Sequence, residues 1–262
     1  LAGGKPKIVK CDEKDGFKIT PLKLKKAISK KTKWIILNSP SNPTGSGYSK
    51  SEIKNLAKIL LKYKKVHILS DDIYEHVKYD NFKFFTIAQI PKLKNRTLTM
   101  NGVSKSYAMT GWRIGYAAGP KEIISAIRKI QSQSTSNPSS ISQAAAVEAL
   151  NGKQDFIKKR ANSFKERRDF VVKSLNSING LNCLKPNGAF YVFPNCKKLL
   201  NKKTKLKKDT DFVQKLLEKQ NVAAVQGSAF GLDGYFRISY ATSMTKLKVA
   251  MTRIKKFCED LG

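Results

Sequence analysis

Short apolar runs alternate with amphipathic helical patterns through the first 150 residues, and this alternation constrains the fold more than any other feature. Each run is too short for a buried helix and therefore predicts a buried strand. The runs lie at 34–37, 66–69, 97–100 and 114–118. Helical patterns lie before, between and after them, and a capping hydroxyl precedes two of these, at Thr20-Pro21 and at Ser49. We therefore expect an α/β fold with a mostly parallel sheet.

The pattern changes after Gly152. A long, highly charged helical pattern covers about 155–178 and has the length of a helix that links two domains. Shorter strand and helix patterns follow it toward the end of the chain. We predict a larger domain over 1–165 and a smaller C-terminal α+β domain over 166–262, joined by this helix.

The chain carries 51 Lys and Arg against 19 Asp and Glu, which gives a net charge of +32. Such a charge suits a nucleic-acid-binding protein, and this is one rival hypothesis. Only 8 of the basic residues are Arg, however, and the 43 Lys are spread along the whole chain, many on polar faces of predicted helices. Because recognition of phosphates and bases favours the forked guanidinium of Arg, we expect a solvated basic surface and no nucleic-acid partner.

Several other classes of protein lack the residues that they need. No apolar run approaches the roughly eighteen residues of a membrane span. The four cysteines form no CxxC pair, and the two histidines have no metal-ligand spacing. We therefore expect no membrane association, no metal, and a reducing cytoplasmic location.

Polar segments follow three of the predicted strands, at 39–45, 71–74 and 104–105. Ligands of parallel α/β sheets bind beyond the carboxyl ends of the strands, so these segments are candidates for a site. Lys105 can form a Schiff base with a carbonyl, although a surface lysine is the plainer interpretation. Arg113 offers a fork that suits a phosphate or a structural ion pair. Asp71 can pair with a protonated pyridine nitrogen or cap a helix, and Tyr74 can hydrogen-bond a phenolic oxygen.

Two further residues complete the set of candidates. Asn42 lies between Pro40 and Pro43, which restrict the loop and present the amide rigidly, although Asn also favours turns. Arg237 lies within the apolar strand pattern at 235–240, where a charge needs a partner. A substrate carboxylate would serve as that partner, and so would an internal Asp or Glu.

Taken together, these segments resemble the fold-type I pyridoxal-phosphate aminotransferases of class I/II, and more narrowly the bacterial aspartate aminotransferase subgroup. The matching stretches are NSPSNPTG at 38–45, SDDIYE at 70–75, SKSYAMTGWRIG at 104–115, QSQSTSN at 131–137 and FRISYATS at 236–243. They occur in the family's order, and the resemblance extends over essentially the whole chain. It implies the fold of the pyridoxal-phosphate-dependent transferases, with a large, mostly parallel cofactor domain and a smaller C-terminal α+β domain.

The resemblance also implies how the candidate residues would hold the cofactor, pyridoxal 5'-phosphate. Lys105 would form the internal aldimine and shuttle the catalytic proton. Asp71 would keep the pyridine nitrogen protonated, which makes the ring an electron sink. Asn42 and Tyr74 would hydrogen-bond the phenolic oxygen of the ring.

The remaining roles concern the phosphate and the substrate. Arg113, assisted by Ser104, would hold the phosphate, and Arg237 with Asn42 would bind the substrate α-carboxylate. The implied reaction is a transamination between an L-amino acid and a 2-oxo acid, with L-aspartate and 2-oxoglutarate as the first pair to consider. The family resemblance also implies a homodimer when the protein is full length.

The chain departs from the family pattern in two respects. Gly102 stands where members often carry Ser, so we expect weaker phosphate binding. The first residue aligns well inside the large domain, so we expect an N-terminally truncated piece that binds cofactor poorly and is inactive or weakly active alone. The alternatives are an aromatic, prephenate or broad-range aminotransferase, a C–S lyase or decarboxylase of the same fold, and a non-catalytic interaction protein.

Overall fold

The computed structural model describes residues 3–261, which pack as two compact units. The sheet unit contains residues 19–41 and 47–161, and the C-terminal unit contains residues 3–18, 42–46 and 162–261. The short segment 42–46 thus packs with a unit that neither of its flanking segments joins. Helix α6 (Asp155–Asn176) begins in the sheet unit and ends in the C-terminal unit.

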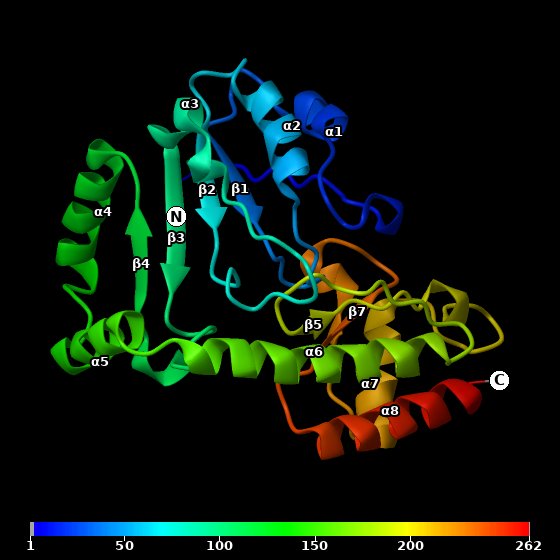
Figure 1. Ribbon diagram of the computed structural model, residues 1–262. Helices are drawn as coiled ribbons and strands as arrows, with labels where there is room; N and C mark the ends of the chain where they lie inside the picture. The colour runs from blue at the N-terminus through cyan, green and yellow to red at the C-terminus, as the bar shows by residue number, and fades with distance from the viewer. Residues whose placement is uncertain (1–2, 262) are drawn as a thin grey trace. The chain divides into compact units, whose positions relative to one another are not determined.

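Within the described residues, the sheet unit is built on four strands in the order β1-β2-β3-β4 (Figure 1). Strands β1 (Trp34–Asn38), β2 (His67–Asp71) and β3 (Thr97–Gly102) are parallel, and β4 (Gly115–Ala118) runs antiparallel to β3. The predicted mostly parallel sheet is therefore confirmed. The accompanying helices are α1 (Pro21–Ala27), α2 (Lys50–Leu60), α3 (Pro91–Lys94), α4 (Lys121–Ser134) and α5 (Ser140–Asn151).

The helices that follow polar caps begin where the local sequence predicts. Thr20 accepts a hydrogen bond from the Lys23 backbone N–H at 3.2 Å, and proline occupies the first position of α1. At the start of α2, the Glu52 backbone N–H donates to the Ser49 hydroxyl at 3.3 Å. The Ser49 backbone N–H donates back to the Glu52 carboxylate at 2.7 Å, which completes a capping box. Both helices thus satisfy backbone donors that would otherwise lack partners.

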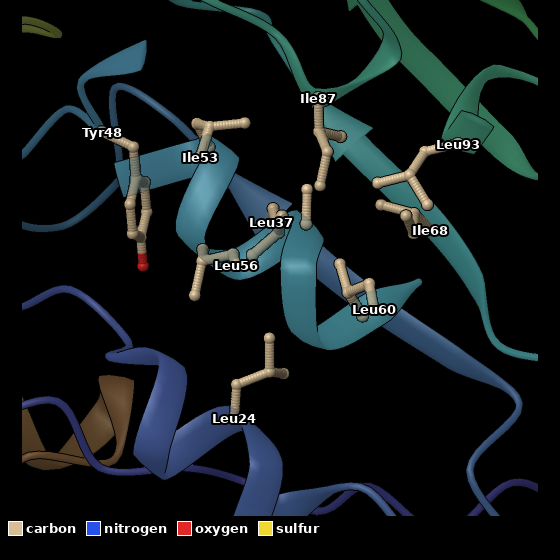
Figure 2. Close-up of a cluster of buried hydrophobic side chains, with 10 residues drawn as sticks. Leu24, Leu37, Tyr48, Ile53, Leu56, Leu60, Ile68, Ile87 and Leu93 are labelled. Atoms are coloured by element: carbon tan, nitrogen blue, oxygen red, sulfur yellow. The ribbon is translucent and has the colours of Figure 1, made fainter. Parts of the chain in front are cut away.

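A buried apolar cluster packs the first two helices against the sheet. Figure 2 shows its labelled side chains, which are Leu24, Leu37, Tyr48, Ile53, Leu56, Leu60, Ile68, Ile87 and Leu93. Leu60, from α2, and Ile68, from β2, are both fully buried. Burying one such side chain contributes about 1.5–3 kcal/mol to stability. The cluster therefore fixes β1 and β2 beneath α1 and α2, and with them the edge at which the strands end.

The C-terminal unit holds a small antiparallel sheet in the order β5-β7-β6. Its strands are β5 (Tyr191–Val192), β6 (Val225–Gln226) and β7 (Phe236–Ser239), and its helices are the end of α6, α7 (Asp209–Gln220) and α8 (Met244–Glu259). The Phe212 ring packs against Phe236 at 4.9 Å and Phe257 at 5.3 Å between ring centres, which ties β7 to α7 and α8. This α+β packing agrees with the pattern predicted for the C-terminal part of the chain.

Short 3-10 helices complete the secondary structure. They are η1 (Glu13–Asp15), η2 (Ile87–Gln89), η3 (Thr110–Trp112), η4 (Lys197–Leu199) and η5 (Gly227–Phe230). Between residues 3 and 261, no helix combines the length and the apolar character that crossing a membrane would require. The same residues contain no group of three or more His, Cys, Asp or Glu side chains arranged to hold a metal ion.

Candidate active site

The carboxyl ends of β1 and β2 meet at one edge of the sheet. The two strands end in register, with Asn38 opposite Asp71, and the Asn38 side-chain amide donates to the Asp71 backbone oxygen at 3.1 Å. Asp71 is half-buried, and its carboxylate accepts a hydrogen bond from the Ile73 backbone N–H at 3.3 Å. Burial raises the pKa of the Asp71 carboxyl, and this hydrogen bond only partly offsets the effect. A cationic ligand group beside Asp71 would therefore stabilise its charged form.

The neighbouring polar residues of this motif are buried more deeply. Asp72 is 3% exposed and accepts a hydrogen bond from the Ser70 hydroxyl at 2.7 Å. Burial raises the pKa of Asp72 to about 6, although hydrogen bonds from Ser70 and Thr86 lower it. Tyr74, in the turn after β2, is also 3% exposed. Asp71 is thus the more accessible carboxylate of the adjacent pair.

The connection between β3 and β4, residues 103–114, starts and ends at the same edge of the sheet. Gly102 pairs with Gly115 at its base, and the buried side chains of Val103 and Ile114 anchor its two ends. A Cβ atom on Gly102 would lie 2.9 Å from the Ile114 backbone oxygen, closer than Cβ atoms normally approach. The close pairing at this point explains why a glycine suits position 102.

Three of the candidate residues lie in this connection. Lys105 and Ser104 are half-buried directly after β3, and Arg113 is exposed directly before β4. The Thr110 hydroxyl donates to the Ser104 backbone oxygen at 3.2 Å, and the Arg113 guanidinium donates to the Thr110 backbone oxygen at 3.0 Å. Arg113 has a left-handed backbone, with φ of +56°, which is uncommon for a residue other than glycine. The fold therefore collects a lysine and an arginine at the edge where Asp71 also lies.

A cavity of about 500 Å³ opens beside this connection. Its polar lining includes Ser104, Arg113 and Arg128, and its apolar lining includes Ile124 and Ile127. Lys105 and Asp71 do not line it. Two guanidinium groups beside an apolar wall favour an anionic ligand.

Arg237 and Asn42 meet in the C-terminal unit, although 195 positions separate them in the sequence. The Arg237 Nη1 donates to the Asn42 Oδ1 at 2.8 Å, and the guanidinium lies over the rings of Tyr191 and Phe230 at 4.7 and 5.0 Å. Among the described residues, no Asp or Glu pairs with Arg237, and its buried Nε has no hydrogen-bond partner. A guanidinium in this state has unused capacity to bind an anion.

The structure thus places the candidates in two groups. Asp71, Tyr74, Ser104, Lys105 and Arg113 belong to the sheet unit, whereas Asn42 and Arg237 belong to the C-terminal unit. No sequence pattern indicated that Tyr191 and Phe230 are neighbours of Arg237. Aromatic residues in apolar segments ordinarily indicate core packing, so only the folded structure reveals their contact with a guanidinium.

Comparisons with known proteins identify the family of the chain. The model of the family "Aminotransferase class I and II" matches residues 1–254. An aspartate aminotransferase from Rhizobium meliloti is 56% identical over 100% of this chain and 65% of its own length. A probable aspartate/prephenate aminotransferase from Rickettsia typhi is also 56% identical, over 100% of this chain and 67% of its own length. The chain therefore spans about two thirds of the length of these relatives.

Solved structures agree in fold. The crystal structure of the aspartate aminotransferase from Rhizobium meliloti matches with a TM-score of 0.95 at 56% identity, over 98% of this chain and 65% of that one. An aromatic aminotransferase from Pyrococcus horikoshii matches with a TM-score of 0.92 at 38% identity, over 99% of this chain and 68% of that one. The predicted transferase fold is confirmed. The chain belongs to the class I and II aminotransferases, a family whose members use pyridoxal phosphate.

Proposed function

We propose that the whole protein is a pyridoxal-phosphate-dependent aminotransferase that moves an amino group between L-aspartate and 2-oxoglutarate. The observation that carries this proposal is the collection of a lysine, an arginine and a desolvated carboxylate at one edge of a parallel sheet. Relatives named aspartate aminotransferase at 56% identity support the choice of substrate. The activity is a proposal for the whole protein, because the chain spans 65% of that relative.

The residues of the sheet unit fit the chemistry of pyridoxal phosphate. When bound, this cofactor supplies an electron-withdrawing ring that weakens bonds at the Cα of an attached amino acid. The Asp71 carboxylate would face the protonated ring nitrogen, because burial leaves that carboxylate in need of a cation. Arg113 and Ser104 would hold the phosphate, and Tyr74, with Asn42, would hydrogen-bond the phenolic oxygen.

Lys105 is the proposed catalytic residue. Its amine would hold the cofactor covalently and, once released from it, would move a proton at the substrate Cα. The lysine is half-buried between the anchored ends of the β3–β4 connection.

Arg237 and Asn42 are the proposed receptors of the substrate α-carboxylate. The Arg237 guanidinium has no carboxylate partner among the described side chains, and Asn42 already occupies its Nη1. A substrate carboxylate would therefore complete the hydrogen bonding of a half-buried cation. This interpretation selects the substrate carboxylate over the internal Asp or Glu that the sequence left open.

Prephenate is a second candidate substrate, because several relatives at 53–56% identity are named probable aspartate/prephenate aminotransferases. We further propose a homodimer in the cytoplasm. The four cysteines, all within residues 3–261, form no disulfide, and three of them are buried, which suits a reducing compartment. Comparing prephenate with 2-oxoglutarate as the amino acceptor of the same preparation would separate the two substrate assignments.

The proposed catalytic lysine is testable by borohydride reduction of the whole protein with pyridoxal phosphate, followed by peptide mass mapping. We expect one phosphopyridoxyl adduct, on Lys105, and its loss in Lys105→Ala. Lys121→Ala, at the exposed start of α4, is the matched control and should keep the adduct. Lys105→Ala should also slow transamination by about 10²–10⁴-fold. Adducts scattered over many lysines, or full activity in Lys105→Ala, would refute the assignment.

A further inference from the structure

The segment 42–46 packs against a turn of the C-terminal unit that is formed by residues 186–188. The Gly45 backbone oxygen accepts hydrogen bonds from the backbone N–H groups of Asn187 at 3.0 Å and Gly188 at 2.9 Å. Gly45 has φ of +66°, and a Cβ atom there would overlap Pro186 and lie 2.6 Å from the Gly188 backbone oxygen. This packing therefore depends on a close backbone approach at position 45 that only glycine permits without strain.

Arg168, on α6, contacts the same turn. Its side chain is fully buried, and its Nη1 donates to the Pro186 backbone oxygen at 3.0 Å. Its Nε donates to the Asp169 Oδ1 at 2.9 Å, and its Nη2 lies 2.7 Å from the same oxygen as an ion pair without hydrogen-bond geometry. The Asp169 carboxylate also meets Lys165 at 3.1 Å and Lys185 at 3.2 Å. Burying a guanidinium carries a large desolvation cost, which these partners offset. Arg168 is therefore a rigid tie between α6 and the turn.

The segment 42–46 and the turn both lead to Arg237. Asn42 is the first residue of the segment, and its Oδ1 accepts the hydrogen bond from Arg237 at 2.8 Å. Tyr191 follows the turn at the start of β5, and its ring lies 4.7 Å from the Arg237 guanidinium. A Cβ atom on Gly45 would also lie 3.0 Å from the Tyr191 backbone oxygen, so the three elements are in direct contact.

We propose that Arg168, the 186–188 turn and Gly45 form a latch that positions Asn42 and Tyr191 around Arg237 and thereby sets the affinity for the substrate carboxylate. Arg168 is a positioning residue, since it reaches Arg237 only through the turn. The inference rests on the proposed function, which assigns the α-carboxylate to Arg237. Weakening these contacts leaves the charge of Arg237 in place, but it lets the guanidinium turn away from the geometry that binds a carboxylate through two hydrogen bonds.

The latch is tested in the whole protein with Arg168→Lys and Gly45→Ala. Lysine keeps the positive charge but lacks the planar fork that joins Pro186 to Asp169. Gly45→Ala perturbs the same contact from its other side, so the test stands even if one variant does not fold. Arg96→Lys is the matched control in the sheet unit, because the Arg96 guanidinium also ties backbone oxygens, at 2.6–2.8 Å. Those oxygens belong to Leu60, Tyr63 and Val66.

The readouts are the dissociation constant of succinate by calorimetry, the KM and kcat for L-aspartate, and the rate with propylamine, which lacks a carboxylate. We expect both latch variants to weaken succinate binding and raise KM by about fivefold to tenfold, the equivalent of one hydrogen bond. The propylamine rate and the Arg96→Lys protein should show no such change. A merely structural role for Arg168 would instead lower all activities together.

The outcomes separate the latch from the proposed function. If the wild type transaminates aspartate and the latch variants bind succinate as tightly as the Arg96→Lys control, the latch is overturned and the proposed function stands. If the wild type binds no succinate and transfers no amino group, the proposed function is overturned, and the latch is overturned with it. Weaker succinate binding confined to Arg168→Lys and Gly45→Ala supports both.

Discussion

Replacing Asp72 with asparagine removes one buried charge while keeping the shape of the side chain. The Asp72 carboxyl is 3% exposed, and burial raises its pKa from 3.8 to about 6. Asparagine retains an oxygen that can accept the hydrogen bond from the Ser70 hydroxyl. The substitution therefore isolates the effect of charge at this position.

The sign of the effect follows from the raised pKa. Above pH 6 the carboxyl is ionised in both the folded and the unfolded protein, and burial then destabilises the folded state by about 3 kcal/mol. This destabilisation disappears as the pH falls from 6 toward 3.8, because the folded state takes up its proton first. Between pH 8 and pH 5, the difference in unfolding free energy between Asp72→Asn and wild type should shrink by about 1.4 kcal/mol.

The assay is urea unfolding of both proteins at several pH values, with the unfolding free energy extrapolated to water. Ser70→Ala is a useful companion variant, because the Ser70 hydroxyl lowers the pKa of Asp72 and its removal should move the titration to higher pH. A stability difference between Asp72→Asn and wild type that stays constant from pH 5 to pH 8 would refute the reasoning. It would show that Asp72 titrates alike in the folded and unfolded protein.

Two further predictions concern the core and the cofactor. Leu60→Ala, at a fully buried position, should lower the unfolding free energy by about 2–5 kcal/mol. Leu22→Ala, at a 62% exposed position of α1, should change it little. Equal losses for the two variants in urea unfolding would contradict the assignment of Leu60 to the core. Arg113→Ala in the whole protein should weaken pyridoxal phosphate binding by about tenfold to a hundredfold in equilibrium dialysis, and unchanged affinity would remove Arg113 from the phosphate site.

Much of the sheet unit was predictable because its determinants are local. Apolar runs of strand length predicted β1, β2 and β3, and hydroxyl caps at Thr20 and Ser49 predicted where α1 and α2 begin. The ends of parallel strands share one edge, so the sequence order of Asp71 and Lys105 was enough to predict that both lie there. These features depend on neighbouring residues and on the period of a strand or helix.

Other features were decided only by tertiary packing. The contact of Arg237 with Asn42 joins positions 195 apart, and no local pattern records which distant side chains will meet. The same holds for the Tyr191 and Phe230 rings beside Arg237 and for the complete burial of the Arg168 side chain.

By itself, the sequence determined the class of fold and the residue types available for chemistry. Periodicity and capping are short-range properties, and they specify strands, helices and the segments that follow them. The tertiary structure decided which of those residues lose water and which acquire partners. Packing brings together the atoms that raise the pKa values of Asp71 and Asp72. It also supplies the partners of Arg168 and the contact of Gly45 with the 186–188 turn. Desolvation and hydrogen-bond geometry depend on that packing, because both are properties of a three-dimensional neighbourhood.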